Sequence, residues 1–253
     1  MTASFSSSVA PDEVAQFSTR AEEWWKPEGD FRMLHQLMPL RLAYVEEQIS
    51  QHLPIPSSPR KRGSRFLSQQ TILDVGCGGG LMAEAMAAKG YNVTGIDASA
   101  QAIAVASAHA VVSGLTIDYR EGTAEGLVKT GAQYDVILAL EIVEHVQNVK
   151  AFMASLAALL KPDGLLIIAT MNRTKRSYLL GVMAAEYVLG WVPAGTHDWD
   201  KFIKPSEMAA LWDGQGIEPV DLTGYSLDPW TRRFILNKGK TAINYFMTGK
   251  RQP

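Results

Sequence analysis

From residue 71 onward, short apolar runs alternate with longer stretches in which apolar residues recur at helical spacing. The runs are rich in β-branched residues and leucine, which is typical of strands buried on both faces. Predicted strands lie at Thr71–Val75, Asn92–Asp97, Thr116–Arg120, Asp135–Leu140 and Leu165–Thr170, and predicted helices at Leu81–Lys89, Ala100–Val112 and Lys150–Leu160. The alternation predicts an α/β fold with a doubly wound, mostly parallel sheet covered by helices on both faces.

The region before this alternation is predicted to be a helical cap. Residues 11–50 carry apolar side chains at helical spacing between Leu34 and Ile49, and Asp12 is a suitable N-cap. Residues 51–69 contain three prolines, several serines and four cations, a composition that does not pack into a core. We expect a linker there. Its basic cluster at 60–65 could contact anionic lipid or nucleic acid, but a solvated connector explains it as well.

The region after the alternation breaks the strand–helix order. Residues 70–253 form the predicted main domain, with an insertion at about 173–204 that begins with a basic and apolar segment. A helix is expected near Ser206–Trp212, followed by two or three strands.

Composition and charge narrow the class of protein. The chain has 253 residues, of which 47% are hydrophobic and 20% charged, enough to bury a substantial core. A formal net charge of −2 gives no general attraction to nucleic acid, and we predict no nucleic-acid partner. The single Cys77 excludes an internal disulfide and fits a reducing cytosol. With no visible secretory signal and no run near the roughly 20 apolar residues that cross a bilayer, we expect a soluble intracellular protein.

A glycine-rich loop follows the first predicted strand. The sequence reads Gly-x-Gly-x-Gly over Gly76, Gly78 and Gly80, with Asp74 just before the turn. A dinucleotide site with the pattern Gly-x-Gly-x-x-Gly would need glycine where Leu81 stands. The loop resembles that of S-adenosylmethionine-dependent methyltransferases more than that of a nicotinamide-dependent enzyme.

Two later features fit the same nucleotide. Asp97 closes the second predicted strand, where its two oxygens could accept hydrogen bonds from both ribose hydroxyls. Ala124 and Glu125 follow the third strand, where folds of this kind border the adenine. Taken together with the glycine loop, they predict S-adenosyl-L-methionine as the cofactor.

Motifs outside this core resemble one family. The chain is similar to the ubiquinone-biosynthesis O-methyltransferases from Phe17 to about Met247, and the likeness is carried by Phe17–Trp25, Gly29–His35, Pro39–Arg41, Ala139–Val146, Gly195–Trp199 and Phe202–Pro205. The resemblance implies O-methylation of 2-polyprenyl-6-hydroxyphenol-type catechols and of 3-demethylubiquinol. The family usually has Asn where Met38 stands, and its join at the linker is shorter.

The resemblance also implies roles near the cofactor's methionine end. Arg41 would pair with the methionine carboxylate, since a guanidinium can form a bidentate fork. Leu140 and Glu141 end the fourth predicted strand, the usual border of that part of the cofactor.

Glu141, Glu144 and His145 are the predicted catalytic cluster. They are spaced i, i+3 and i+4, so a helical turn would project all three to one side. A phenolic hydroxyl has a pKa near ~10 and needs either a base or a divalent cation to lose its proton. Paired carboxylates suit Mg²⁺, whereas imidazole is an unusual ligand for it, so both mechanisms remain open, as does a surface turn with solvated glutamates. His197, beside Asp198, is a second candidate base, although a lone histidine is more often structural.

The substrate's polyprenyl tail suggests a membrane contact. Residues 173–193 open with three cations and continue as an apolar stretch too short and interrupted to span a bilayer. Such a segment suits a helix lying in the interface of an anionic membrane, or an ordinary helix packed on the sheet. We predict a cytoplasmic protein that is peripherally associated with the inner membrane. A ubiquinone-biosynthesis complex is a further candidate partner. Two rival functions stay open, a carbon or nitrogen methyltransferase and a non-catalytic cofactor-binding scaffold.

Overall fold

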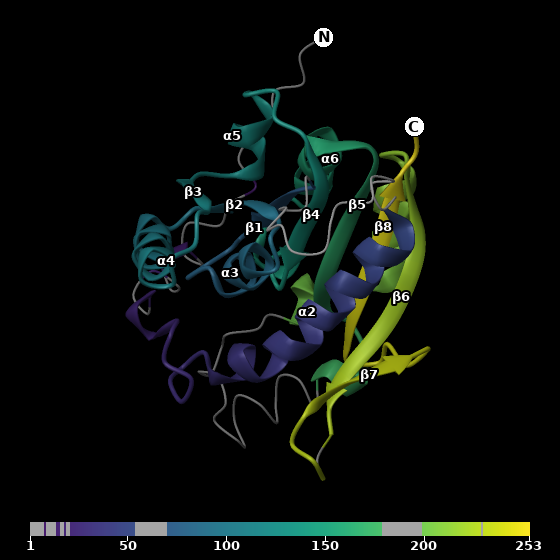
Figure 1. Cartoon of the computed structure of the whole chain (residues 1–253). Helices are drawn as coiled ribbons and strands as arrows, with labels where there is room; N and C mark the ends of the chain where they lie inside the picture. The colour runs from purple at the N-terminus through teal and green to yellow at the C-terminus, as the bar shows by residue number, and fades with distance from the viewer. Residues whose placement is uncertain are drawn as a thin grey trace, which may run out of the picture.

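The computed structural model describes Ser8, Val14, Ala15 and Ser18, and residues 21–53, 70–178, 199–228 and 230–253. One eight-stranded sheet forms the centre, with the strand order β3-β2-β1-β4-β5-β8-β6-β7 (Figure 1). The strands are β1 (Thr71–Val75), β2 (Asn92–Asp97), β3 (Asp118–Glu121), β4 (Tyr134–Leu140), β5 (Leu160–Met171), β6 (Ile217–Leu227), β7 (Phe234–Lys238) and β8 (Asn244–Arg251). β1 to β5 pair in parallel, and β6, β7 and β8 join antiparallel. The predicted doubly wound, mostly parallel sheet is confirmed.

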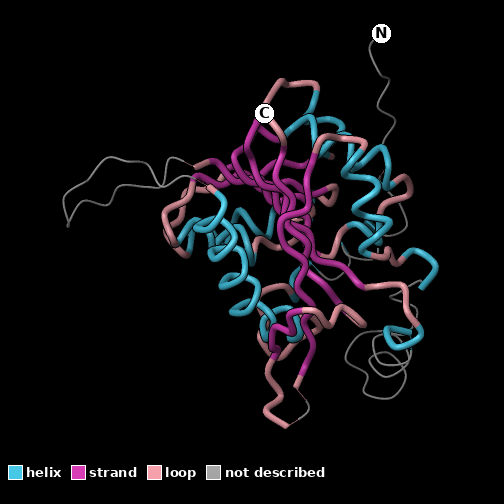
Figure 2. The backbone as a smooth tube through the Cα atoms, turned by 90° about the vertical axis from the view of Figure 1, so that its right-hand side faces the viewer, coloured by secondary structure: helices cyan, strands magenta, loops and turns pink. Residues whose placement is uncertain are grey.

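Helices cover both faces of this sheet (Figure 2). They are α2 (Arg32–His52), α3 (Leu81–Ala88), α4 (Ala100–Val112), α5 (Ala124–Val128), α6 (Val149–Leu159) and α7 (Pro205–Asp213), with short 3-10 turns η1 (Ala21–Glu23), η2 (Val143–His145) and η4 (Trp199–Lys201). One apolar cluster packs α6 and α7 on the sheet through Leu156 and Trp212. The other packs α2 and α3 through Tyr44, Val45 and Met86. Because both faces are covered, the central strands β4 and β5 read as continuous apolar runs.

The N-terminal prediction needs one correction. A helical stretch over residues 11–50 was expected, but turns over residues 24–31 separate η1 from α2. Pro27 and Gly29 lie in this interval and explain the break, since neither favours a helix interior. Asp12, the predicted N-cap, lies outside the described residues, as does most of the predicted linker. α2 itself crosses β8 and β6 (Figure 1), and Tyr44 donates to Asp221 Oδ2 at 2.7 Å.

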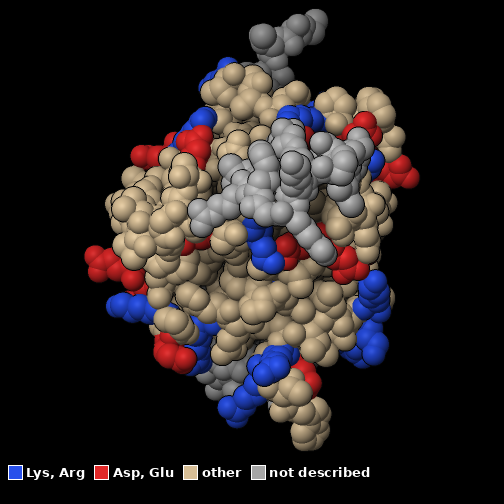
Figure 3. Space-filling view, in the orientation of Figure 1, with Lys and Arg blue, Asp and Glu red and all other residues tan. Residues whose placement is uncertain are grey.

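Charges are mixed over the face seen in Figure 3, where Lys and Arg lie among Asp and Glu, most of them toward the rim. None of the described helices has the length and hydropathy that crossing a bilayer requires.

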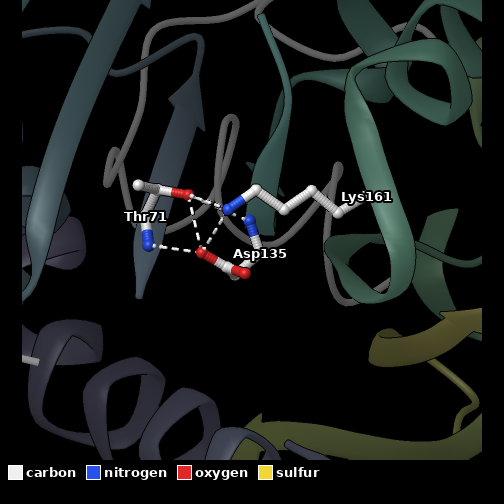
Figure 4. A network of polar contacts seen from close by, with 3 residues as sticks. All are labelled: Thr71, Asp135 and Lys161. Carbon is white, nitrogen blue, oxygen red and sulfur yellow. Dashed lines mark hydrogen bonds and ion pairs between the residues drawn. The ribbon is translucent and has the colours of Figure 1, made fainter. Parts of the chain in front are cut away.

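A polar clamp joins three strands at the amino end of the parallel sheet. Asp135 Oδ2 on β4 accepts from Thr71 N (2.8 Å) and Thr71 Oγ1 (2.7 Å) on β1, and from Lys161 Nζ (2.9 Å) on β5 (Figure 4). Asp135 N returns a bond to Thr71 Oγ1 at 3.1 Å. Burial acts to raise the pKa of Asp135, but the hydrogen bonds from Lys161 and Thr71 outweigh it and hold the pKa below its ordinary value. The carboxylate therefore stays charged and satisfied.

Candidate active site

The glycine loop lies at the opposite end of the sheet, between β1 and α3. β1 sits between β2 and β4, so the strand order reverses there, which is where open α/β sheets bind ligands. Gly76, Gly78 and Gly80 have φ values of 72°, 52° and 90°. Any side chain would be strained at these angles, which explains why the sequence places glycine at all three alternate positions.

Asp97 lies against this loop, at the end of β2. Its Oδ2 accepts from Gly78 N at 2.9 Å, and its Oδ1 accepts from Ser99 N at 2.8 Å. Each carboxylate oxygen has a further lone pair, so both can still accept from a ligand. Burial raises the pKa of Asp97, while the two backbone N–H groups act in the opposite direction. The structure places Asp97 beside the glycine loop, and its role toward a cofactor stays a prediction.

Asp74 is buried at the end of β1 with a polar atom left over. Its side chain is 3% exposed, and Oδ2 has no hydrogen-bond partner among the described residues. Burial raises its pKa from 3.8 to about 7, against the nearby charge of Arg41, which lowers it. A buried, unsatisfied carboxylate oxygen is costly unless a ligand donates to it.

Arg41 on α2 reaches the end of β4. Its Nη2 pairs with Glu141 Oε1 at 2.9 Å, and its Nε has no partner within the described ranges. Tyr225 on β6 also donates to Glu141 Oε1. Burial acts to raise the pKa of Glu141, but the Arg41 charge and the bond from Tyr225 outweigh it and lower the pKa. Arg41 is thus held near the predicted methionine end by a protein carboxylate, and its pairing with the cofactor stays a prediction.

Glu144 lies behind this pair. It is 4% exposed, and its Oε2 accepts from Thr170 Oγ1 at 2.8 Å. Burial, followed by the negative charge of Glu141, raises the pKa of Glu144. The two carboxyl groups therefore differ: Glu141 favours the ionised form and Glu144 holds a proton more readily.

The predicted metal set does not form in this arrangement. Glu141 has φ 55°, and Glu144 and His145 lie in a 3-10 turn. The expected α-helical turn over these three residues is therefore wrong. No group of three His, Cys, Asp or Glu side chains in the described part of the chain converges as metal ligands. These residues do not fit a three-ligand Mg²⁺ site.

The residues predicted to border the adenine, Ala124 and Glu125, lie at the start of α5. Thr123 caps this helix, accepting from Gly126 N at 3.2 Å. Ala124 is 2% and Glu125 3% exposed, and neither oxygen of Glu125 has a partner among the residues described. Leu140, at the end of β4, is partly buried against the cluster that packs α2 and α3. His197 and Asp198 lie outside the described residues, so the second candidate base stays a prediction.

Sequence reasoning missed three contributors. Tyr225 lies on the antiparallel strand β6. No local motif in the sequence predicts that its side chain reaches the end of β4. Trp24 lies on the glycine loop so closely that a Cβ added at Gly79 would lie 2.5 Å from Trp24 Cβ. Trp25 Nε1 donates to Gly79 O at 2.8 Å, and its ring stacks on His109 with centroids 3.4 Å apart. The two adjacent tryptophans are conspicuous in the sequence, but their spacing does not predict which part of the protein they contact.

Comparison with known proteins agrees with this geometry. Residues 43–222 match the family described as "Methyltransferase domain". The chain is 45% identical to the ubiquinone biosynthesis O-methyltransferase of Parvibaculum lavamentivorans, over 97% of this chain and 95% of that one. It is 42% identical to that of Cereibacter sphaeroides strain ATCC 17029, over 98% of each chain, and 40% identical to that of Rhizobium johnstonii, over 99% of each.

Solved structures share the fold at low identity. The plantazolicin methyltransferase BamL, in complex with S-adenosylhomocysteine (SAH), has a TM-score of 0.64 at 17% identity, covering 96% of this chain and 97% of that chain. Magnesium protoporphyrin IX methyltransferase from Synechocystis PCC 6803, with bound S-adenosylmethionine (SAM), has a TM-score of 0.59 at 16% identity, covering 96% and 99%.

Proposed function

The chain belongs to the ubiquinone biosynthesis O-methyltransferases, and from this premise we propose that it methylates the phenolic hydroxyls of polyprenylated catechols. It is an S-adenosylmethionine-dependent O-methyltransferase of ubiquinone biosynthesis. The proposed substrates are 2-polyprenyl-6-hydroxyphenol-type intermediates and 3-demethylubiquinol. The observation that carries the proposal is the meeting of the glycine loop, Asp97, Asp74 and the Arg41–Glu141 pair at one end of the sheet.

The polar atoms left over at this site fit the cofactor. Asp97 would accept from the ribose hydroxyls, and Asp74 Oδ2 from the methionyl ammonium. The buried carboxylate of Glu125 would accept from the adenine amino group, and Arg41 would approach the methionyl carboxylate through its free Nε. When bound, S-adenosylmethionine supplies an electrophilic methyl group on a sulfonium.

The protein's own contribution is to position the phenol and take its proton. A phenol with a pKa near ~10 is a poor nucleophile at neutral pH, so proton transfer to a base must accompany attack. We assign that role to the Glu141–Glu144 pair. Arg41 and Tyr225 hold Glu141 in place, and Glu144 lies close enough to interact with it. His145 and His197 remain alternative bases. Positioning supplies much of the remaining rate, since the sulfonium is already activated.

The predicted membrane contact at 173–193 is retained with one change. Lys175 and Arg176 are exposed, and Tyr178 is 45% exposed. Arg173, which was expected to face the membrane, instead pairs with Glu207 and donates to Asp200 O and Phe202 O. Lys175 and Arg176 are therefore the cations that support a peripheral association with the inner membrane. Residues beyond 178 in this segment lie outside the described part, and recruitment by a ubiquinone-biosynthesis complex stays a prediction.

Turnover of a short-chain, water-soluble catechol tests the proposed function. We expect the purified chain and S-adenosylmethionine to give a product heavier by one methylene, with a methoxy signal in its NMR spectrum. A carbon- or nitrogen-bound methyl group, or cofactor binding without any product, would contradict the proposal.

A further inference from the structure

The turn that connects β6 to β7 projects from the body of the protein (Figures 1 and 3). Asp228 orders this turn from its first position. Its Oδ1 accepts from Trp230 N at 2.9 Å, its Oδ2 accepts from Thr231 Oγ1 at 2.8 Å, and its backbone O accepts from Arg232 N at 2.8 Å. Asp228 N closes the turn by donating to Arg233 O at 2.9 Å. The turn is thus ordered by its own hydrogen bonds.

This ordered turn displays a tryptophan to solvent. Trp230 is 92% exposed, whereas tryptophan is usually among the more buried residue types. Its amphipathic ring suits the interface between headgroups and hydrocarbon, where tryptophan is enriched. Ile235, on the strand that leaves the turn, is 41% exposed. An ordered turn that holds such a side chain in water indicates a contact surface.

The same turn and its outgoing strand are basic. Arg232, Arg233, Lys238 and Lys240 are all exposed, and none has an ion-pair partner among the described residues. Asp228 is the only carboxylate in residues 228–240 of the sequence, so the segment carries a net charge of +3 (four cations minus one carboxylate) in a chain whose net charge is −2. The complementary partner is an extended anionic surface.

The end of the hairpin opposite this turn, where β7 leads toward β8, adjoins the start of the segment already proposed to meet the membrane. Asn172 Nδ2 donates to Thr241 O at 2.7 Å, and Thr174 Oγ1 donates to Ala242 O at 2.5 Å. The exposed Lys175 and Arg176 follow directly. In the other direction, β6 leads from the turn to Tyr225, three residues and about 10 Å away, which contacts Glu141 in the active site. The turn and the site thus share one strand.

We propose that the β6–β7 turn, through Trp230, Arg232 and Arg233, docks the protein on an anionic lipid bilayer beside the active site. The ring of Trp230 enters the headgroup layer and the two guanidinium groups contact lipid phosphates. The inference rests on the proposed function, because a polyprenyl substrate is dissolved in that bilayer. A protein partner is the poorer fit, since one exposed tryptophan at a narrow tip falls far short of the roughly 1,000 Å² that a specific interface buries.

Vesicle flotation of the full chain tests this surface. The vesicles are phosphatidylcholine with phosphatidylglycerol, and pure phosphatidylcholine is the neutral comparison. We expect the double variant Arg232→Ser/Arg233→Ser to lose about 25-fold in affinity for the anionic vesicles, at about fivefold per cation, and the loss to shrink with salt. Trp230→Ser should weaken binding at low and high salt alike, because its contribution is apolar.

Matched controls separate this surface from general charge and from the neighbouring segment. Lys129→Ser/Lys150→Ser removes the same charge from exposed positions elsewhere, and Val112→Ser removes another exposed apolar side chain. Both should bind as the unaltered protein does. Equal losses in the controls, or normal binding of both turn variants while Lys175→Ser/Arg176→Ser abolishes it, would overturn the proposal. Turnover of the water-soluble catechol should survive in the turn variants, so a failure of docking stays distinguishable from a failure of the proposed function.

Discussion

The two ends of the same parallel sheet hold aspartates in opposite surroundings, since Asp135 is partly exposed and Asp74 is buried. At the amino end, Asp135 is bonded to Thr71 and Lys161, and its pKa is lowered. At the carboxyl end, Asp74 keeps an oxygen without a partner among the described residues, and its pKa is raised to about 7. The amino end is organised for stability. At the carboxyl end, buried polar groups lack hydrogen-bond partners among the described residues. This is typical of a site whose hydrogen bonds are completed by a ligand.

The largest expected effect comes from removing Arg41, a buried cation that faces the carboxylates of Glu141 and Asp74. Arg41→Met leaves Glu141 and Asp74 without their nearest positive charge, and it should lower the free energy of unfolding by about 3 kcal/mol at neutral pH. Urea denaturation measures the change. The matched variant at the amino end, Lys161→Met, should lose only about 1 kcal/mol, because its side chain is 37% exposed. Equal losses for the two variants would remove the distinction between the two ends.

A second effect should appear in binding rather than in folding. Asp97→Ala removes the acceptor proposed for two ribose hydroxyls, and should weaken S-adenosylmethionine binding by about 1–3 kcal/mol for each group left unpaired. Titration calorimetry reports this directly. Asp135→Ala, at the far end of the sheet, should leave the affinity of the folded protein unchanged. Unaltered affinity in the Asp97 variant would mean that the ribose is held elsewhere.

Tyr225→Phe should give a smaller effect that is confined to catalysis. The variant removes one hydrogen bond to the charged Glu141, worth about 1.5 kcal/mol, and so should slow methylation of a soluble catechol about tenfold. Because the phenyl ring keeps its packing against Phe246 and Phe234, cofactor affinity should stay the same. A variant with unchanged kcat would show that Glu141 does not depend on Tyr225.

Local signals in the sequence predicted the parallel half of the sheet and the cofactor loop well. Local sequence determines where a glycine with positive φ, an acid at the end of a strand or an apolar strand lies. Gly76, Gly78 and Asp97 could therefore be placed from their spacing alone. Contacts between distant segments could not be placed. Tyr225 donates a hydrogen bond to Glu141, which lies 84 positions earlier in the sequence. Trp24 contacts the glycine loop from the turns at residues 24–31, where the sequence pattern had predicted a helix. The helical turn expected at Glu141 failed because that residue adopts a positive φ.

The comparison also gives opposite pH behaviour for the two aspartates. The folded-state pKa of Asp74 lies above 3.8, so its contribution to stability is fully present below pH 3.8 and is lost as the pH rises through about 7. Asp135 has a lowered pKa, so its contribution is present above its ordinary pKa and is lost as the pH falls through the folded-state value.

The most direct test is the free energy of unfolding of Asp74→Asn and Asp135→Asn at pH 8, without cofactor. Asp74→Asn removes a buried charge that lacks a full set of partners and should stabilise the protein by about 1 kcal/mol, while weakening S-adenosylmethionine binding. Asp135→Asn breaks a satisfied clamp and should destabilise by about 1 kcal/mol, with affinity unchanged. Opposite signs would support the account. Destabilisation by both variants, together with normal cofactor binding in Asp74→Asn, would contradict it.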